Sequence, residues 1–179
     1  MFKKISLDKF YRLINHGPCV LITSGTKEKT NIAPIAWNMP LNDEPPLVAI
    51  AIAETHYTAD LIIKSGELVI NIADRNLLPF IKYCGEVSGR KIDKIKKMNI
   101  KLLKGVKINT PHLEKAAGFL ECRIIDKKNY DGVILFIGKV IYAAVRSDIF
   151  DDYWLSDKAK IVHHLGGSYF ACLGKRFKA

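Results

Sequence analysis

Polar side chains follow the small apolar stretch "AIA" at 51–53 and come just before a helix-like stretch. The sequence there, "ETHYTAD", supplies the hydroxyl groups of Thr55 and Thr58 and the imidazole of His56. The N-terminus of a helix exposes backbone N–H groups and carries the positive end of the helix dipole, so these side chains could bind an anion. The structural alternative is that Thr58 only caps the helix and that His56 lies on the surface.

Motifs for other kinds of chemistry are missing. The sequence has no Gly-x-Gly-x-x-Gly after a strand, no Walker loop, no Gly-x-Ser-x-Gly elbow and no paired-carboxylate motif. No residue can therefore be named as catalytic. If the protein carries out a reaction, we expect a cofactor to supply the chemistry.

The cysteines and histidines do not predict a metal or disulfide site. Cys19, Cys84, Cys122 and Cys172 are far apart and form no Cys-x-x-Cys pair, so we expect reduced thiols packed as small hydrophobic groups. His163 and His164 are adjacent and would point to opposite faces of a strand. We therefore expect no bound metal.

The positive charge is concentrated in one segment. The chain has a net charge of +10, and residues 89–107 hold eight Lys and Arg side chains against the single acid Asp93. An anionic partner, including nucleic acid, is one interpretation. The segment has no aromatic residues for base stacking and has regularly spaced apolar residues, which favours a solvated basic face in which one or two lysines contact a phosphate.

Short strands separated by turn residues dominate the predicted elements. One amphipathic helix is expected over 7–15, closed by "HGP", and two more over 58–66, with Thr58 as N-cap, and over 76–85, shortened or kinked by Pro79. Few helices lie between the strands, which indicates an antiparallel barrel and not alternating βαβ units. The expected strands are 19–26, 30–41, 45–53, 68–73, 117–126, 133–145 and 166–174.

Length and hydropathy predict one folding unit over residues 1–179. The 20.1 kDa chain is 49% hydrophobic and has no repeat, linker or low-complexity segment. Its longest apolar run, at 47–53, is too short to span a bilayer, and the first eleven residues lack the apolar stretch of a signal peptide. We therefore expect a cytoplasmic protein with no membrane association.

Several blocks, taken in order, resemble the flavin reductase-like, FMN-binding split-barrel family, and most closely its flavoredoxin branch. They are "NIAPIAWNMPLNDEPPLVAIAI", "THYTADLIIKSGELVIN", "CGEVSGRKIDK", "GFLECRI" and "LFIGKV", with "HHLGGSYFACLGK" near the C-terminus. The resemblance implies a mainly β fold with short helices, an antiparallel Greek-key split β-barrel. It also implies a homodimer with noncovalent FMN near the subunit interface.

The resemblance also implies which residues contact FMN. It assigns this role to Asn31, Ala36, Trp37, Asn38, Met39, Ala51, Ile52, Ala53, His56, Tyr57, Thr58, Ser88, Gly89, Lys94 and Tyr169. Lys94 would contribute positive charge to the flavin site, whereas Arg90 and Lys91 are expected in an ordinary surface turn.

Residue chemistry supports part of this assignment. The Asn38 amide needs partners that a polar ring edge would supply, although Trp37 and Met39 could simply be core residues. Tyr169 and Phe170 point in opposite directions along a strand, so one could cover the flavin while the other packs inward. We favour Tyr169 as the cover.

One departure from the family pattern bears on function. Many flavin reductases have a histidine just before the strand that corresponds to "VILFIG", and this chain has Asp131 and Gly132 there. A carboxylate would repel a phosphate-bearing nicotinamide donor. The sequence therefore favours a carrier that passes electrons through FMN to or from a protein partner. The alternatives are an NAD(P)H:flavin oxidoreductase and, more remotely, a basic nucleic-acid-binding barrel.

Overall fold

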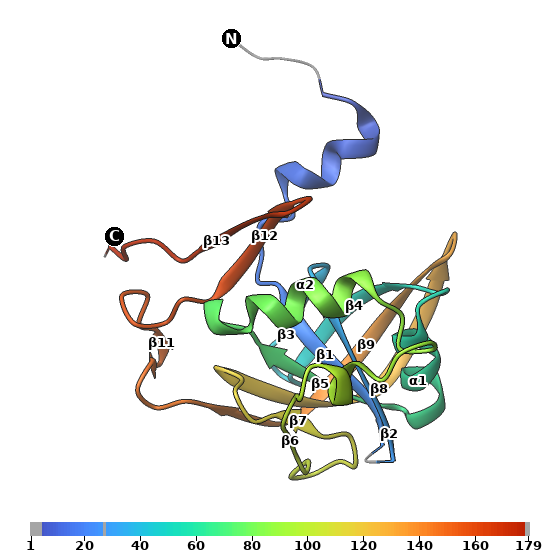
Figure 1. The fold of residues 1–179 in the computed structure, drawn as a ribbon. Coiled ribbons are helices and arrows are strands. Elements are labelled where there is room, and N and C mark those ends of the chain that lie inside the picture. The colour runs from blue at the N-terminus through green and yellow to red at the C-terminus, as the bar shows by residue number, and fades with distance from the viewer. Residues whose placement is uncertain (1–4, 27, 178–179) are drawn as a thin grey trace.

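Seven antiparallel strands form the central sheet of the computed structural model, which describes residues 5–26 and 28–177 (Figure 1). Their order across the sheet is β2-β1-β5-β8-β9-β4-β3, so the connection from β4 to β5 crosses over the intervening strands. The mainly β, antiparallel fold is therefore confirmed. The strands are β1 (Val20–Thr26), β2 (Lys29–Ile35), β3 (Asn38–Asn42), β4 (Leu47–Ala53), β5 (Glu67–Ile72), β8 (Gly118–Tyr130) and β9 (Val133–Val145).

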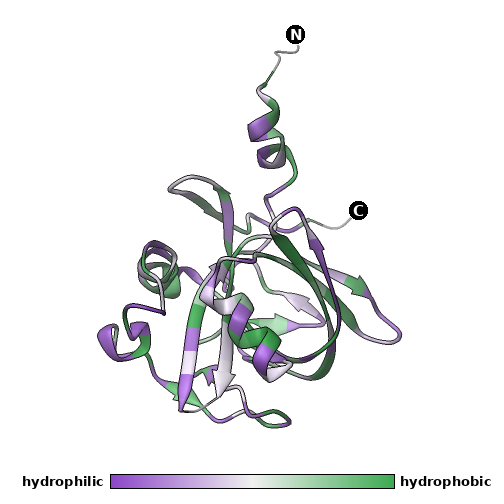
Figure 2. Ribbon diagram, turned by 90° about the vertical axis from the view of Figure 1, so that its right-hand side faces the viewer, coloured by the Kyte–Doolittle hydropathy of each residue, from purple (hydrophilic) through white to green (hydrophobic). Residues whose placement is uncertain are grey.

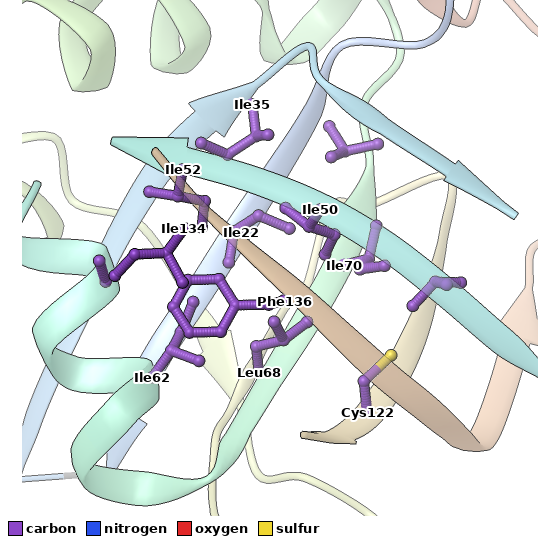
Figure 3. Close-up of a cluster of buried hydrophobic side chains, with 13 residues drawn as sticks. Ile22, Ile35, Ile50, Ile52, Ile62, Leu68, Ile70, Cys122, Ile134 and Phe136 are labelled. Carbon is purple, nitrogen blue, oxygen red and sulfur yellow. The ribbon is translucent and has the colours of Figure 1, made fainter. Parts of the chain in front are cut away.

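Aliphatic side chains from these strands meet in the main core (Figure 3). Ile22, Ile50 and Phe136 are almost completely buried there, and Ile62 joins them from the helix that follows β4. Burying each such side chain is worth about 1.5–3 kcal/mol. This core holds the strands whose ends carry the predicted site.

The strand expected over 30–41 is two strands. β2 pairs with β1 at one edge of the sheet and β3 pairs with β4 at the other, so the chain bends at Ala36 and Trp37 to pass between the edges. The strand expected over 166–174 is also shorter. Gly166 and Gly167, with φ of 118° and 59°, form the turn between β12 (Val162–Gly166) and β13 (Tyr169–Cys172).

The first helix differs most from the prediction. Residues Leu7–Leu13 form a 3-10 helix, η1, and none of its residues is buried. The arm that contains η1 stands away from the sheet, beyond the β12–β13 hairpin, and carries both hydrophobic and polar residues (Figures 1 and 2). The predicted helix is therefore present in a shorter form, as a 3-10 helix with no buried residue.

The other helices begin at different residues from those expected. α1 covers Tyr57–Ser65 and ends at Gly66 in the left-handed conformation, as predicted. α2 covers Leu78–Glu86 after a short 3-10 turn, η2 (Arg75–Leu77), and Pro79 lies in its first turn, so this proline starts the helix and does not kink it. The remaining elements are α3 (Lys94–Lys97), β6 (Leu102–Leu103), β7 (His112–Leu113), β10 (Phe150–Asp151) and β11 (Tyr153–Trp154).

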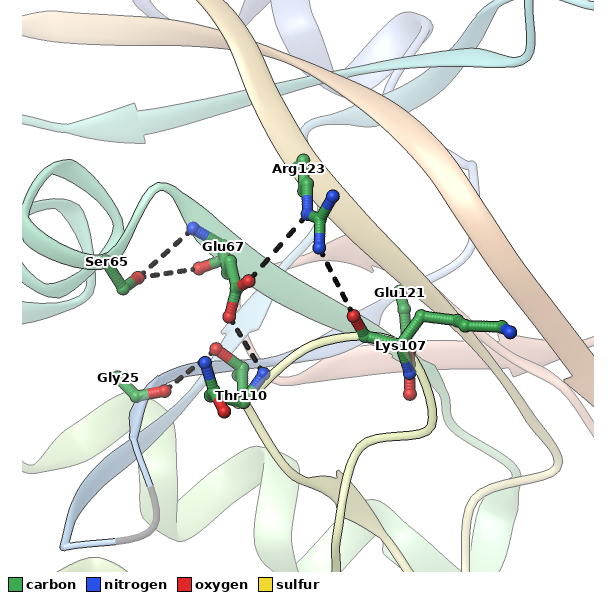
Figure 4. Close-up of polar contacts among 8 residues, drawn as sticks. Gly25, Ser65, Glu67, Lys107, Thr110, Glu121 and Arg123 are labelled. Atoms are coloured by element: carbon green, nitrogen blue, oxygen red, sulfur yellow. Dashed lines mark hydrogen bonds and ion pairs between the residues drawn. The ribbon is translucent and has the colours of Figure 1, made fainter.

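Two carboxylates of the sheet hold the loop 104–111 against it (Figure 4). Glu121, fully buried on β8, accepts hydrogen bonds from the backbone N–H groups of Val106 (2.6 Å) and Lys107 (2.7 Å). Glu67 on β5 accepts one from the N–H of Asn109 at 2.9 Å. The loop after the lysine-rich segment is therefore anchored to the barrel wall.

The four cysteines are free thiols, and three of them are buried. Burial raises the pKa of Cys19 and Cys122 to about 12 and that of Cys84 to about 11. These three pack as small hydrophobic groups, as predicted, whereas Cys172 is half-buried. Over the part of the chain that the structure describes, none of the helices is long and apolar enough to cross a membrane.

Candidate functional site

Seven of the predicted site residues line one hollow of about 340 Å³. The hollow opens between the start of α1 and the segment that runs from the end of α2 to α3, and it is called the Lys94 hollow below. The sequence separates these residues widely, and the fold brings them together because β2 packs beside both α1 and α3. The seven are Asn31, His56, Tyr57, Thr58, Ser88, Gly89 and Lys94.

Lys94 is a buried cation without a carboxylate partner among the described residues. Its side chain is 5% exposed, and Nζ donates hydrogen bonds to the backbone carbonyls of Ile32 (2.9 Å) and Cys84 (2.8 Å). Burial lowers the pKa of this ammonium group below its ordinary value. An ammonium group has three donors, so one N–H is left for a ligand in the hollow.

Thr58 does not cap α1. His56 is the N-cap residue, in an extended conformation, and no side chain caps this end of the helix. Thr58 lies in the first turn, two residues after His56, and is almost fully buried, and its Oγ1 accepts a hydrogen bond from Asn31 Nδ2 at 2.9 Å. Its hydroxyl proton is therefore available to an acceptor in the hollow, beside the positive end of the helix dipole.

Two buried polar atoms at the wall have no hydrogen-bond partner in the described part of the chain. They are Asn31 Oδ1 and the Tyr57 hydroxyl. Gly89 packs directly against both side chains, because a Cβ at this position would collide with Asn31 Oδ1 and lie 3.0 Å from Tyr57 Cδ1. Such groups normally have a partner, so a polar ligand in the hollow would satisfy an otherwise costly arrangement.

Positive charge also lies at the rim. The Arg90 guanidinium forms an ion pair with Asp60 and lies 5.2 Å from the centre of the Tyr57 ring. Lys29 Nζ lies 5.6 Å from the same ring. Arg90 lies in an exposed turn, as expected, although its side chain is paired beside the hollow, and Lys91 is exposed as well.

A second hollow of about 750 Å³ adjoins the first, and the two share Pro34, Gly85 and Glu86 as wall residues. Phe170 and His164 of the β12–β13 hairpin line it, so it is called the Phe170 hollow below. A β-bulge between His164 and Gly166 sets the direction of these side chains.

Tyr169, which we favoured as the flavin cover, is 76% exposed and lines no hollow described here. The alternation predicted for the two aromatic residues is present, and Phe170 is the one that faces the hollow. The choice of Tyr169 therefore needs correction.

A third hollow of about 400 Å³ contains most of the predicted ring contacts. It is lined by Ala36, Trp37, Asn38, Met39 and Ala51, together with residues of the η1 arm. It is called the Trp37 hollow below.

The argument about Asn38 needs correction. Its Nδ2 already donates to the backbone carbonyls of Pro18 (3.0 Å) and Ile35 (3.2 Å), so no flavin edge is needed to satisfy that group. Ile52 is also a core residue, 2% exposed, so only its backbone could approach a ligand. Ala53 is half-buried, and its carbonyl accepts the His56 N–H at 3.0 Å.

The "DG" pair that replaces the expected histidine is a hairpin turn. Asp131 and Gly132 join β8 to β9 with φ of 50° and 87°, the combination typical of a two-residue type I′ turn. Glu54 holds this turn, because its N–H donates to the Gly132 carbonyl (2.8 Å) and its carboxylate accepts from Asn129. Glu54 and the exposed Asp131 therefore meet at this turn, just before the residues that open α1 and line the Lys94 hollow.

The sequence interpretation missed several wall residues. Pro34, Gly85 and Glu86 join the two hollows, and no role was assigned to them. Glycine and proline side chains carry no chemistry that a pattern could detect. A weak signal existed, since "CGEV" stands in one of the blocks that resemble the family.

Comparisons with known proteins identify the family of this chain. A sequence model described as "Flavin reductase like domain" matches residues 11–164. The chain belongs to this flavin reductase-like family. A relative of the family from Escherichia coli, the uncharacterized protein YddH, is 35% identical over 99% of this chain and 98% of its own length.

Solved structures of the flavin reductase-like family show the same fold. Flavoredoxin from Methanosarcina acetivorans has a TM-score of 0.88 at 23% identity, covering 100% of this chain and 95% of that one. The FMN-binding domain of a flavin reductases-like enzyme from Shewanella baltica has a TM-score of 0.84 at 28% identity, covering 98% and 95%. The predicted split-barrel fold and the resemblance to this family are thus confirmed.

The flavin cofactor suggested by the family fits the residues that are present. The Lys94 hollow has a spare ammonium donor, a spare hydroxyl donor at Thr58 and an uncapped helix N-terminus, which are groups that a phosphate requires. The Phe170 hollow next to it is larger and lined mainly by apolar groups, as a flat ring requires. The chain thus offers a polar hollow and an apolar hollow side by side.

Proposed function

We propose that this protein binds FMN noncovalently and transfers electrons through it, in the manner of a flavoredoxin. The observation that carries the proposal is Lys94, a buried ammonium group whose two neutral partners leave one donor for an anion. The flavin would supply the redox chemistry, and the side chains would set its position, affinity and potential.

The phosphate end is assigned to the Lys94 hollow. Lys94 would donate its third N–H and Thr58 its hydroxyl proton to the phosphate oxygens, and the start of α1 would contribute its dipole. Gly89 keeps Asn31 and Tyr57 close to the same group. Ser88 and His56 complete the wall.

The ring end is assigned to the Phe170 hollow, which adjoins the phosphate end. Pro34 and Ala36 form part of its wall and allow close approach of a flat ring, and Phe170 covers it from the hairpin. Ala36 also lines the Trp37 hollow, so Trp37 lies at the next edge of the site. These side chains exclude water from the ring and do not titrate.

We propose that the working form is a homodimer, because the η1 arm leaves large apolar side chains uncovered. Leu7 and Ile14 are 83% and 72% exposed, and Phe10 and Trp37 line the half-open Trp37 hollow beside the arm. Contiguous apolar surface of this kind usually marks an interface. Light scattering after size exclusion should give twice 20.1 kDa, and a monomer that retains FMN would contradict this part of the proposal.

An NAD(P)H:flavin oxidoreductase is the second candidate, favoured by the family's similarity to flavin reductases. The carboxylates of Glu54 and Asp131 argue against a reductase. They belong to residues that meet at the β8–β9 turn, and they would repel a phosphate-bearing donor. Stopped-flow mixing with NADH and NADPH separates the two candidates. Slow bleaching of the flavin supports the carrier, and bleaching within milliseconds supports the reductase.

The proposal as a whole is tested by the absorption spectrum of the freshly purified protein and by titration of the flavin-free protein. We expect a flavin spectrum, and FMN binding at least about tenfold tighter than riboflavin, because only FMN has the phosphate that Lys94 and Thr58 contact. A colourless protein that binds neither flavin would overturn the proposal. Equal affinity for both flavins would show that the phosphate site is wrong.

A further inference from the structure

Six exposed lysines follow directly after the wall of the Lys94 hollow. Within the described residues, none of the ion pairs found involves any of them. Asp93 is the only acid between residues 90 and 107, and its carboxylate accepts the Lys96 N–H at 2.9 Å as the cap of α3. The six, called the lysine face, are Lys91, Lys96, Lys97, Lys101, Lys104 and Lys107.

The lysine face is joined to the hollow through α3. Lys94 points inward and is buried, whereas Lys96 and Lys97 of the same short helix are exposed. Ser88 and Gly89, which line the hollow, come just before Lys91. Positive charge therefore begins at the phosphate end of the proposed site and continues outward from it.

The backbone that carries these lysines is anchored. Ile100 and Ile108 are buried, and Ile95 packs against the second cluster of the core. Glu121 holds the N–H groups of Val106 and Lys107. An anchored surface loses little conformational freedom when a partner binds, so its charges can act in a fixed arrangement.

We infer that the lysine face is the docking surface for an acidic electron-transfer protein that exchanges electrons with the bound flavin. The inference rests on the proposed function, because it gives the carrier a partner. Complexes of redox proteins are small and transient, and opposite charge mainly raises their association rate. A steered encounter at this face would be expected to form 10- to 1,000-fold faster than an unsteered one.

Nucleic acid fits this surface less well. Residues 88–107 contain no Phe, Tyr, Trp or His on which a base could stack. The carboxylates of Glu54 and Asp131 at the β8–β9 turn would also repel a polyanion that extended across the site. A compact acidic protein can instead place its charges over α3 alone.

The electron count defines the reaction of the pair. Each encounter with a reduced iron–sulfur partner oxidises one iron centre by one electron and passes that electron to the flavin. Two encounters, with one proton from water, complete a two-electron reduction.

The test uses the full chain loaded with FMN and two probes of opposite charge. Stopped-flow absorbance gives the rate of flavin reduction by a reduced acidic [2Fe–2S] ferredoxin, and the rate of flavin reoxidation by a basic c-type cytochrome. With the ferredoxin we expect the rate to fall about tenfold or more between about 20 mM and 300 mM salt. With the cytochrome the rate should rise or stay level.

Matched double variants separate the lysine face from net charge alone. Lys96→Glu with Lys97→Glu should lower the low-salt ferredoxin rate about tenfold or more. Lys127→Glu with Lys139→Glu changes the net charge equally at exposed lysines of β8 and β9 and should change the rate less than about threefold. Equal losses in both variants would overturn the inference.

The absorption spectrum of each variant shows whether it still holds FMN. This measurement separates failure of the docking inference from failure of the proposed function. A protein that holds FMN and shows no dependence on the lysine face refutes only the docking surface. A protein that holds no FMN refutes the carrier. A different result would assign the lysine face to nucleic acid. In that case the protein would bind a single-stranded oligonucleotide tightly and in a salt-sensitive way, the double variant Lys96→Glu with Lys97→Glu would lose this binding, and the ferredoxin rate would not change.

Discussion

Replacing Lys94 with methionine tests the central feature of the proposed site. The change removes the ammonium group and keeps a side chain of similar length in the same buried position. A hydrogen bond to a charged group is worth about 1.5–3 kcal/mol, so loss of the contact to the phosphate should weaken FMN binding about 10- to 150-fold. Titration of the flavin-free protein, followed by quenching of FMN fluorescence, measures this directly.

The same change has a predictable effect on the protein without FMN. Methionine leaves the carbonyls of Ile32 and Cys84 without their donor, at a cost of about 1–3 kcal/mol each. It also removes the cost of a buried charge, which offsets part of that loss. We therefore expect thermal unfolding, followed by circular dichroism, to shift downward by a few degrees without loss of the fold.

The pH dependence follows from the direction of the Lys94 shift. Burial lowers the pKa of Lys94 in the folded protein below 10.5, so between the two values the unfolded chain binds more protons than the folded one. The stability of the flavin-free protein should rise with pH across that window. A phosphate favours the charged ammonium, so FMN affinity should fall as pH rises through the lowered pKa. Both dependences should be absent in Lys94→Met.

Lys96→Met is the matched control, because Lys96 lies on the same helix, is exposed and loses the same charge. It should change FMN affinity by less than about threefold, since exposed charges interact weakly through water. The reasoning would be refuted if Lys94→Met bound FMN as tightly as the natural protein. It would also fail if both variants lost affinity equally, because general electrostatics would then explain the effect.

Three further predictions test the packing around the site. Gly89→Ala should displace Asn31 and weaken FMN binding about tenfold, whereas Gly174→Ala, where a Cβ meets no atom within 4 Å, should leave binding unchanged in the same titration. Glu121→Gln should lower the free energy of unfolding in urea by about 1–3 kcal/mol, because an amide cannot accept from both N–H groups, while the exposed Glu114→Gln should have little effect. Mass spectrometry should show iodoacetamide modifying Cys172 first, since burial raises the pKa of the other three thiols; rapid labelling of any of those three would contradict the core packing.

Local sequence patterns predicted the strands well where one face or both faces are buried. The range of β9, Val133–Val145, is the predicted one, because its apolar residues and the flanking turn residues Asp131 and Gly132 leave no other assignment. The break at Ala36 was not predictable in this way. The break arises because β2 pairs with β1 at one edge of the sheet and β3 pairs with β4 at the other. This pairing is a property of the whole sheet and not of the local sequence.

The candidate site shows the same difference between what local patterns predict and what depends on the whole fold. Patterns in the sequence indicated an anion site at the start of α1, but they assigned Thr58 to capping, and the resemblance to the family was needed to add Lys94. Neither could show that Lys94 is buried with two carbonyl partners, because those partners come from β2 and α2. Tyr169 was preferred over Phe170 without a pattern that separates them, because alternation along a strand shows that they face opposite ways but not which one faces the hollow.

The division of charge in this molecule gives its proposed role a physical basis. Carboxylates lie where Glu54 meets the β8–β9 turn, just before α1 begins, whereas Arg90, Lys94 and the lysine face belong to the segment between α2 and β7. A dinucleotide donor would bring its phosphates toward the carboxylates, at an energetic cost, whereas an acidic protein can approach over the lysines without meeting them. Reversing the charge at the β8–β9 turn by Asp131→Lys should therefore raise the rate of flavin reduction by NADPH and leave the ferredoxin rate nearly unchanged. If the two rates changed together, the turn and the lysine face would not act separately, and charge could not explain the choice of partner.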